Sequence, residues 1–226
     1  MITAFLPCRA GSERIPNKNT KDFAGIKGGL LKIKIEQLVE VKLIDKLLIS
    51  TNDTQVIKIA QSFKNKKIII DKRPEHLTLS STSTDEVINY VPNIINAGHV
   101  VWTHVTSPFF NTDNYTSAIQ EYLSGIENKT HDSLMSVNKI QNFLWGENGS
   151  FNYDSKIEKW PRTQTLNKLY EINSGVFINS IENYVKYQNR IGNSPKYFES
   201  PGLSSFDIDW PDDFTLGELI FKSLNK

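Results

Sequence analysis

One stretch decides the fold of this chain, Phe5-Leu6-Pro7-Cys8-Arg9-Ala10-Gly11-Ser12-Glu13-Arg14-Ile15-Pro16-Asn17-Lys18-Asn19, and it continues an apolar run that begins at residue 2. The apolar run predicts a buried parallel strand, and the residues after it form a loop. Because ligands of open α/β sheets bind at the carboxyl ends of strands, the N–H groups around Gly11 and Ser12 are expected to form an anion-binding concavity. Three cations complete this predicted polyphosphate site: Arg9, Arg14 and Lys18.

Two common phosphate-binding motifs are absent from this stretch. The P-loop requires glycine, four residues and then Gly-Lys-Ser or Gly-Lys-Thr, and the dinucleotide-binding fingerprint requires Gly-x-Gly-x-x-Gly. Gly11 is the only glycine among residues 1–23, so neither motif can be formed there. The stretch is therefore a different kind of phosphate site, or else a solvated basic loop that links a strand to a helix.

The loop resembles the signature of the sugar-activating cytidylyltransferases, the family of CMP-sialic acid synthetase (acylneuraminate cytidylyltransferase), in which Arg-x-Gly-Ser-x-x-x-Pro-x-Lys-Asn follows the first strand. The matching positions are Arg9, Gly11, Ser12, Pro16, Lys18 and Asn19. The resemblance implies that the substrates are CTP and an acidic acceptor, and that Mg²⁺ is required. It implies nucleotide contacts from Arg9, Ala10, Gly11, Ser12, Arg14, Lys18 and Asn19.

Length and charge limit the classes of protein that this chain can form. Its 226 residues suffice for one large α/β domain over residues 1–226. The 26 basic and 25 acidic residues nearly cancel, so no overall field draws the protein onto nucleic acid or an anionic membrane. A single cysteine excludes an internal disulfide and indicates a reducing compartment. Without an apolar run of about 18 residues or room for a signal peptide, we expect a cytoplasmic protein.

Strand-like and helix-like patterns alternate along the chain. Strands are predicted at residues 2–6, 46–51 and 67–70, with helices at 30–41 and 56–63 between them. This order indicates βαβ units with right-handed crossovers and a Rossmann-like α/β fold. The later predicted elements are a helix to about residue 95, a strand at 100–105, a helix at 114–123, strands at 133–137 and 170–179, and a helix at about 213–224. The resemblance implies the three-layer, mostly parallel sheet of the nucleotide-diphospho-sugar transferase type.

A hydroxyl-rich run, Ser80-Ser81-Thr82-Ser83-Thr84, follows Arg73 and leads into a predicted helix. Ser83 or Thr84 is a good N-cap for that helix, and capping alone explains the run. The resemblance implies a second role, because the family holds the cytidine with an arginine and a small hydroxyl residue at the positions of Arg73 and Ser83. Many relatives carry Asp where Ser80 stands, so the match is firmer at Arg73.

The strand at residues 100–105 leads into Thr106-Ser107-Pro108, at the same predicted sheet edge as the first loop. The family reads Gln-Pro-Thr-Ser-Pro here, which implies nucleotide contacts from Thr106 and Ser107. His104 stands in place of the glutamine, as a contact to nucleotide and acceptor. Because imidazole titrates near neutral pH, His104 is also a candidate general base. The alternative is a structural histidine at a strand end.

Aromatic and turn-forming residues dominate about 138–168, which favours a β-rich excursion with exposed aromatic side chains. In the resembled family this region is a dimerisation arm that reaches the second subunit, so a homodimer is implied. Trp160-Pro161-Arg162-Thr163-Gln164 resembles the Arg-x-Gln that ends the arm, where a cation meets the carboxylate of an acidic sugar. Arg162 and Gln164 are therefore candidate acceptor contacts, and the alternative for Arg162 is an ordinary surface ion pair.

The predicted strand at 170–179 resembles the family's Asn-Gly-hydrophobic-aromatic-Ile segment. Ser174 stands where the family has its Asn, and Asn173 lies one residue earlier. We predict acceptor contacts from Glu171 and Asn173, and we expect acceptor recognition to differ from that of the family.

Two carboxylates, Asp207 and Asp209, precede the terminal helix in a segment that resembles the family's Asp-Ile-Asp-x-x-x-Asp. In an extended segment, residues two apart point to the same side, so both carboxylates can reach one hard cation. Mg²⁺ prefers oxygen ligands, and no set of His and Cys suggests zinc. Asp212 and Asp213 fit the N-terminus of the helix, whose dipole favours negative charge. The alternative is a single solvated acidic turn.

These features together predict the transfer of CMP from CTP to a nonulosonic acid, such as sialic, legionaminic or pseudaminic acid, with release of pyrophosphate, for surface glycan biosynthesis. The predicted catalytic residues are Arg9 and Lys18, which neutralise phosphate charge, and Asp207 and Asp209, which hold the Mg²⁺. Three alternatives remain: a phosphonate or phosphorylated acceptor, a catalytically silent nucleotide-binding protein, and a glycosyltransferase. The last is disfavoured, because its Asp-x-Asp normally follows a mid-chain strand.

Overall fold

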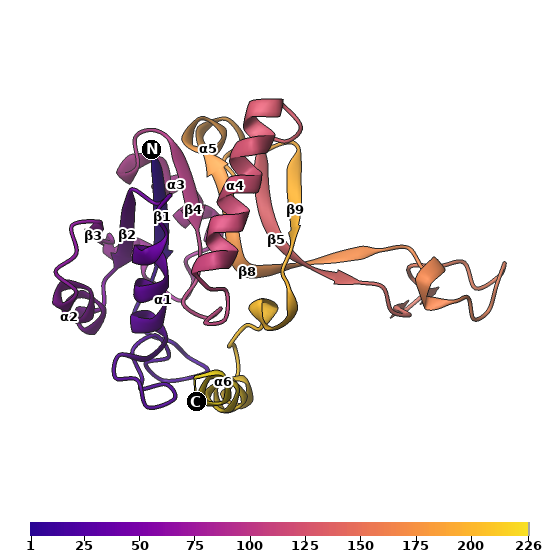
Figure 1. The fold of residues 1–226 in the computed structure, drawn as a ribbon, viewed down its shortest axis with the longest axis horizontal. Coiled ribbons are helices and arrows are strands. Elements are labelled where there is room, and N and C mark those ends of the chain that lie inside the picture. The colour runs from indigo at the N-terminus through magenta and orange to yellow at the C-terminus, as the bar shows by residue number, and fades with distance from the viewer. Residues whose placement is uncertain (226) are drawn as a thin grey trace.

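A seven-stranded sheet forms the centre of the structure, a computed structural model that describes residues 1–225 (Figure 1). Its strands are β1 (Ile2–Pro7), β2 (Lys46–Thr51), β3 (Ile68–Lys72), β4 (His99–Trp102), β5 (Ser133–Ile140), β8 (Leu169–Ser180) and β9 (Pro195–Glu199). They lie in the order β3-β2-β1-β4-β8-β5-β9. β8 pairs antiparallel with β4 and β5, and the other pairs are parallel. The predicted mostly parallel sheet is therefore confirmed.

Helices cover both faces of the sheet, which makes it the middle of three layers (Figure 1). One face carries α1 (Gly29–Glu40), α2 (Thr54–Ser62) and α4 (Thr112–Asn128), and the other carries α3 (Thr84–Ile94) and α5 (Ile181–Tyr187). Successive strand residues point to opposite faces. Ala4 and Leu6 of β1 thus belong to the core under α1, whereas Phe5 belongs to the core under α3.

The C-terminal helix α6 (Pro211–Leu224) packs against the segment that leads into α1. The ring of Phe23 makes edge contacts with Phe214 and Phe221, at centroid distances of 5.1 and 5.7 Å. Such aromatic pairs contribute on the order of 1 kcal/mol beyond the area they bury. Helix α6 is therefore held against the chain that follows the first loop, and the segment just before α6 is brought beside that loop.

The sequence predictions differ from the structure in three places. The strand expected at 100–105 ends at Trp102, so His104 lies in the loop beyond it. The helix α5 and the strand β9 were not predicted from the sequence at all. α5 has only seven residues, and β9 is an edge strand with a half-exposed pattern that begins at Pro195. Neither has enough periodicity to stand out in the sequence.

The arm leaves the sheet where β5 and β8 continue together as a two-stranded ribbon, from Val137 paired with Ile172 to Ile140 paired with Leu169 (Figure 1). Beyond the ribbon lie the two-residue strands β6 (Trp145–Gly146) and β7 (Gly149–Ser150) and the 3-10 turn η2 (Thr163–Thr165). The buried side chain of Asn152 organises the tip. It accepts from the N–H of Leu144 (3.1 Å) and donates to the carbonyl oxygen of Asn142 (2.8 Å).

Candidate active site

The loop after β1 is fixed by hydrogen bonds to its own end and to the residues after β2. The N–H of Ala10 donates to Asn52 Oδ1 (2.9 Å), and Asn19 Nδ2 donates to the carbonyl oxygen of Arg9 (3.3 Å). Gly11 has a φ of 79°, a left-handed conformation that glycine adopts without strain. The loop is thus shaped by its own residues and by the neighbouring strand.

Successive N–H groups of this loop, those of residues 11–14, have no hydrogen-bond acceptor within the described part of the chain. A turn that leaves successive N–H groups open makes an anion-binding concavity. The guanidinium of Arg9 lies over the same turn, with Nη1 3.4 Å from the carbonyl oxygens of Ala10 and Gly11. The loop therefore offers both N–H donors and positive charge to an anion.

A cavity of about 350 Å³ lies at the carboxyl ends of β1 and β4. It joins the first loop to residues after β3, to the start of α3 and to the loop after β4. The predicted nucleotide residues in its lining are Arg9, Ser12, Arg14, Lys18, Asn19, Arg73, Ser83, His104 and Thr106. Of the same set, Ala10, Gly11 and Ser107 do not line it. Residues up to 97 positions apart in sequence thus converge as the motifs predict.

Arg73 is 6% exposed and is held by the end of β2. Its Nε donates to Ser50 Oγ and its Nη2 to the carbonyl oxygen of Ser50, both at 3.0 Å. Ser50 Oγ in turn donates to Asp71 Oδ2 (2.7 Å). Burial lowers the pKa of Arg73. Nη1 has no acceptor among residues 1–225, so one corner of the guanidinium remains for a ligand, and the contact to cytidine stays a prediction.

Ser83 is the N-cap of α3, as one of the two sequence interpretations predicts. Its Oγ accepts from the N–H of Glu86 (3.2 Å), and its own N–H donates to Glu86 Oε2 (2.7 Å). This reciprocal pair is a capping box, which stabilises helix starts by about 1 kcal/mol. Ser83 also lines the cavity, so its predicted nucleotide contact is compatible with capping.

His104 lies against Trp102, whose Nε1 donates to His104 Nε2 (2.9 Å). Nδ1 therefore carries the proton of the neutral ring. Burial, with help from the cations Arg190 and Lys18, lowers the pKa of His104 to about 3. The expectation that His104 titrates near neutral pH is thus wrong, because the apolar surroundings disfavour the charged ring. His104 presents an N–H donor instead of a base.

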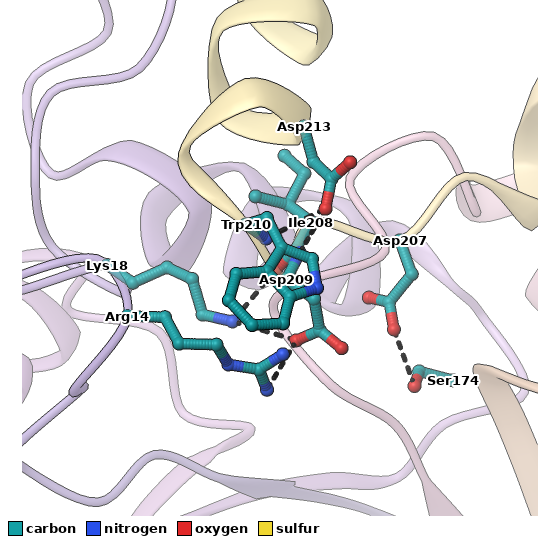
Figure 2. Close-up of polar contacts among 8 residues, drawn as sticks. All are labelled: Arg14, Lys18, Ser174, Asp207, Ile208, Asp209, Trp210 and Asp213. Atoms are coloured by element: carbon teal, nitrogen blue, oxygen red, sulfur yellow. Dashed lines mark hydrogen bonds and ion pairs between the residues drawn. The ribbon is translucent and has the colours of Figure 1, made fainter.

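Of the two carboxylates before α6, Asp209 contacts the first loop and Asp207 contacts Ser174 of β8 (Figure 2). Asp209 Oδ1 accepts from Lys18 Nζ (3.2 Å) and from Arg14 Nη2 (3.3 Å). Asp207 Oδ2 accepts from Ser174 Oγ (2.9 Å), while Asp207 Oδ1 is buried with no partner among residues 1–225. Asp209 thus joins the loop cations Arg14 and Lys18. Because its side chain is 43% exposed, each of these pairs stabilises the fold by at most about 1 kcal/mol.

This carboxylate segment is held at both ends. Asp213 Oδ2 accepts from the N–H groups of Trp210 (2.7 Å) and Asp209 (3.0 Å), which confirms its predicted place at the helix start (Figure 2). The N–H of Ile208 donates to the carbonyl oxygen of Thr106 (2.9 Å). The segment is therefore tied to the loop after β4 as well as to the first loop.

Lys34 of α1 supports the loop after β4 and was not predicted as a functional residue from the sequence. It is fully buried, and Nζ donates to the carbonyl oxygens of Ser107 (2.8 Å) and Phe110 (3.0 Å) and to Tyr115 Oη (2.9 Å). Burial lowers the pKa of Lys34, and nearby Asp207 raises it. A signal existed, because Lys34 lies four residues from both Leu30 and Leu38, inside the apolar stripe of the helix.

Two predicted acceptor residues lie where β8 enters the arm. Asn173 Nδ2 donates to Asn138 Oδ1 (2.7 Å) and Ser200 Oγ (3.0 Å), and Asn173 Oδ1 accepts from the N–H of Gly175 (3.1 Å). Glu171 Oε2 accepts from Asn138 Nδ2 (3.0 Å). These bonds join β5, β8 and the chain after β9. Asn173 therefore has a structural role, and its contact with an acceptor stays a prediction.

The other two predicted acceptor residues, Arg162 and Gln164, lie at η2 on the arm and are exposed. The arm projects away from the sheet (Figure 1), and neither residue lines the cavity of its own chain. The sequence predicts that Arg162 and Gln164 contact the acceptor, but within one chain they do not reach the cavity that the other predicted residues line.

Two solved structures show the same fold. CMP:2-keto-3-deoxy-manno-octonic acid synthetase, complexed with CTP, aligns with a TM-score of 0.68 over 99% of both chains, at 15% identity. A 4-diphosphocytidyl-2C-methyl-D-erythritol synthase from Anaerococcus prevotii aligns with a TM-score of 0.65 over 98% of this chain and 96% of the other, at 14% identity. This likeness shows that the chain has the Rossmann-like α/β fold of these two proteins.

The cytidylyltransferase family matches residues 3–221, and the chain belongs to this family. It is similar to a pseudaminic acid cytidylyltransferase of Campylobacter jejuni serotype O:2, with 24% identity over 96% of this chain and 95% of the relative. It is also similar to an N-acylneuraminate cytidylyltransferase of Escherichia coli O18:K1:H7, with 25% identity over all of this chain and 53% of the relative. The protein is a CTP-dependent nucleotidyltransferase, as the first loop predicts. Among residues 1–225, no helix has the length and apolar character to cross a membrane.

Proposed function

We propose that this enzyme transfers CMP from CTP to a nonulosonic acid and releases pyrophosphate. The observation that carries the proposal is the contact between Lys18 and Asp209, which joins the phosphate loop to the carboxylate segment beside the cavity at the carboxyl ends of β1 and β4. Relatives named for pseudaminic, N-acylneuraminic and N,N'-diacetyllegionaminic acids support the choice of acceptor. Each of these acceptors is named as an acid and would therefore bring an anionic group to the site.

In the proposed reaction an acceptor oxygen forms a bond to the α-phosphorus while the bond from that phosphorus to the pyrophosphate oxygen breaks. The acceptor hydroxyl gives its proton to solvent water, and pyrophosphate leaves with the electron pair of the broken bond. Arg9, Lys18 and the open N–H groups of residues 11–14 would stabilise the charge on the triphosphate and the leaving group. The fixed loop would hold the triphosphate in line, which lowers the barrier by positioning. His104, neutral at working pH, would donate a hydrogen bond rather than take the proton.

We further propose that Asp207 and Asp209 hold Mg²⁺. The fit is good, because Asp207 Oδ1 is buried without a partner and Asp209 Oδ2 has none within residues 1–225. The described residues contain no group of three or more His, Cys, Asp and Glu that could hold a metal. Two carboxylates nevertheless suffice for Mg²⁺, which usually keeps several waters and binds substrate phosphates. When bound, the ion supplies Lewis-acid stabilisation of phosphate charge.

A homodimer is the proposed assembly, with the arm of one chain reaching the site of the other. Three aromatic side chains of the arm support it: Trp145, Phe151 and Trp160 are 65, 70 and 72% exposed. Exposed apolar surface of this kind marks interaction sites. In such a dimer Arg162 and Gln164 would approach the partner's acceptor. We place the enzyme in the cytoplasm, in the biosynthesis of a surface glycan.

The test is a screen for CTP-dependent pyrophosphate release. Nonulosonic acids, phosphonates and phosphorylated sugars are compared at saturating Mg²⁺, with and without EDTA. The proposal predicts release with a nonulosonic acid, formation of an equal amount of CMP-sugar, and loss of both with EDTA. Release with only a phosphorylated acceptor would indicate a different cytidylyltransferase. CTP binding without release for any acceptor would indicate the catalytically silent protein.

A further inference from the structure

Arg190 lies in the turn after α5, on the face of the sheet that carries α3. Its guanidinium carbon is 3.6 Å from the ring centroid of Phe177 and 5.5 Å from that of Trp102. These two aromatic residues are paired neighbours on β8 and β4. Cation–π contacts of this kind hold an arginine in place without neutralising its charge. The guanidinium is thus fixed on the sheet, beside the strand that leads to His104.

This arginine has no anionic partner in the described part of the protein. It makes no hydrogen bond and no ion pair with residues 1–225. Asp85 acts on its charge only from a distance, and burial lowers the pKa of Arg190. A largely buried cation without a partner is costly, whereas a guanidinium fork binds a carboxylate through two parallel hydrogen bonds. An anion that arrives with a ligand would remove this cost.

The guanidinium opens into a second cavity of about 280 Å³. Ile88, Met135 and Ile172 give this cavity an apolar wall, and Thr84 and Asp85 lie on its α3 side. Thr84 also lines the cavity at the carboxyl ends of β1 and β4, as does Trp102, on which Arg190 packs. The two cavities are therefore adjacent, with Thr84 in the wall of both.

We propose that Arg190 binds the carboxylate of the acceptor sugar in this second cavity, an inference that rests on the function proposed above. A carboxylate suits the site better than a phosphate. Asp85 lines the same cavity and would repel a dianion more strongly than a monoanion. The apolar wall of Ile88, Met135 and Ile172 gives an apolar substituent of the acceptor a place to pack. The carboxylate of the acceptor is then bound within the chain that binds the CTP.

The test compares Arg190→Gln and Arg190→Lys with the wild type. The proposal predicts that Arg190→Gln raises the acceptor KM by about 10- to 100-fold and leaves the CTP KM within about twofold, with Arg190→Lys between. Binding should change in the same way. The acceptor alone should no longer raise the melting temperature of Arg190→Gln, whereas CTP should raise it as in the wild type. Lys186→Gln is the matched control, because Lys186 is a cation of α5 that packs on Tyr187. It should change neither KM.

The opposite result is an unchanged acceptor KM in Arg190→Gln while the wild type is active, and it would overturn this inference alone. A parallel rise of both KM values together with a lower melting temperature would also overturn it, as the sign of a structural role. If Arg190→Gln does not fold, Arg190→Lys decides, since it keeps the charge and loses the fork. Absence of turnover by the wild type with every acidic acceptor would instead contradict the proposed function.

Discussion

The first loop and the arm serve the two substrates of the proposed reaction, yet they are built in opposite ways. The loop is held within one chain, through Asn19 and Asn52, and it meets Asp209 through Lys18. The arm leaves the sheet and carries aromatic side chains that its own chain leaves exposed. The difference teaches that one chain brings most of the predicted nucleotide residues together around one cavity, whereas the aromatic surface of the arm would be buried only in the proposed dimer.

The largest expected effect comes from a substitution in the first loop. Lys18→Ala removes a charge that stabilises the phosphates, so we predict a loss of kcat of about 10²-fold or more with little change in melting temperature. Steady-state pyrophosphate release and thermal unfolding measure the two. Lys21→Ala is the matched control, because Lys21 is a neighbouring cation that packs on Phe214 and should be neutral for kcat. Near-normal turnover of Lys18→Ala would remove the loop from the mechanism.

The second prediction concerns Lys34, the buried lysine that supports the loop after β4. Lys34→Met leaves the carbonyl oxygens of Ser107 and Phe110 short of a donor in the core, so we predict a loss of unfolding free energy of about 3 kcal/mol. Denaturant titration of the variant and of Lys32→Met, an exposed lysine of the same helix, gives the comparison. Equal stability of the two variants would show that the buried ammonium does not support the loop after β4.

The third prediction concerns the arm. Replacing Phe151 and Trp160 together by serine is expected to shift the protein from dimer to monomer and to lower acceptor turnover by about 10-fold, because apolar burial drives association. CTP binding should stay within about twofold of the wild type. Light scattering, kinetics and calorimetry measure these quantities, with Leu219→Ser as an exposed apolar control outside the arm. A dimer that survives the double replacement would place the interface elsewhere.

The smallest effect concerns pH. His104 has a pKa of about 3 when folded, below its usual 6.5. Its contribution to stability is therefore full above pH 6.5 and is lost as pH falls from 6.5 toward 3, because the unfolded chain takes up the proton first. His104→Gln should be less sensitive to acid than the wild type and should keep activity at pH 7. Melting temperatures from pH 7 to 4 test this, with His76→Gln as an exposed control.

Most of the correct predictions rest on residues that lie near one another in the sequence. The pattern of the first loop predicts a phosphate site because its turn and cations lie within eleven positions, and apolar periodicity predicts the strands around it. The role of Lys34 was not predicted, because a lysine within the apolar stripe of a helix is normally expected to extend to the solvent-exposed edge of that helix. Arg190 follows a short helix with no motif, and only the pairing of Trp102 with Phe177 gives it a place. Arg162 and Gln164 could not be placed beside the predicted site, because they lie on the arm and do not line the cavity of their own chain.

The central claim is that the loop holds CTP while Asp207 and Asp209 serve the chemistry. The most direct measurement is CTP affinity and turnover of Asp209→Asn on one preparation across a Mg²⁺ titration. The account predicts that turnover falls by about 10³-fold while CTP affinity stays within about fivefold, because Arg9, Lys18 and the loop N–H groups remain. Asp212→Asn, the control, should turn over normally and lose at most about 1 kcal/mol of stability at the helix start. Normal turnover of Asp209→Asn at saturating Mg²⁺ would contradict the account.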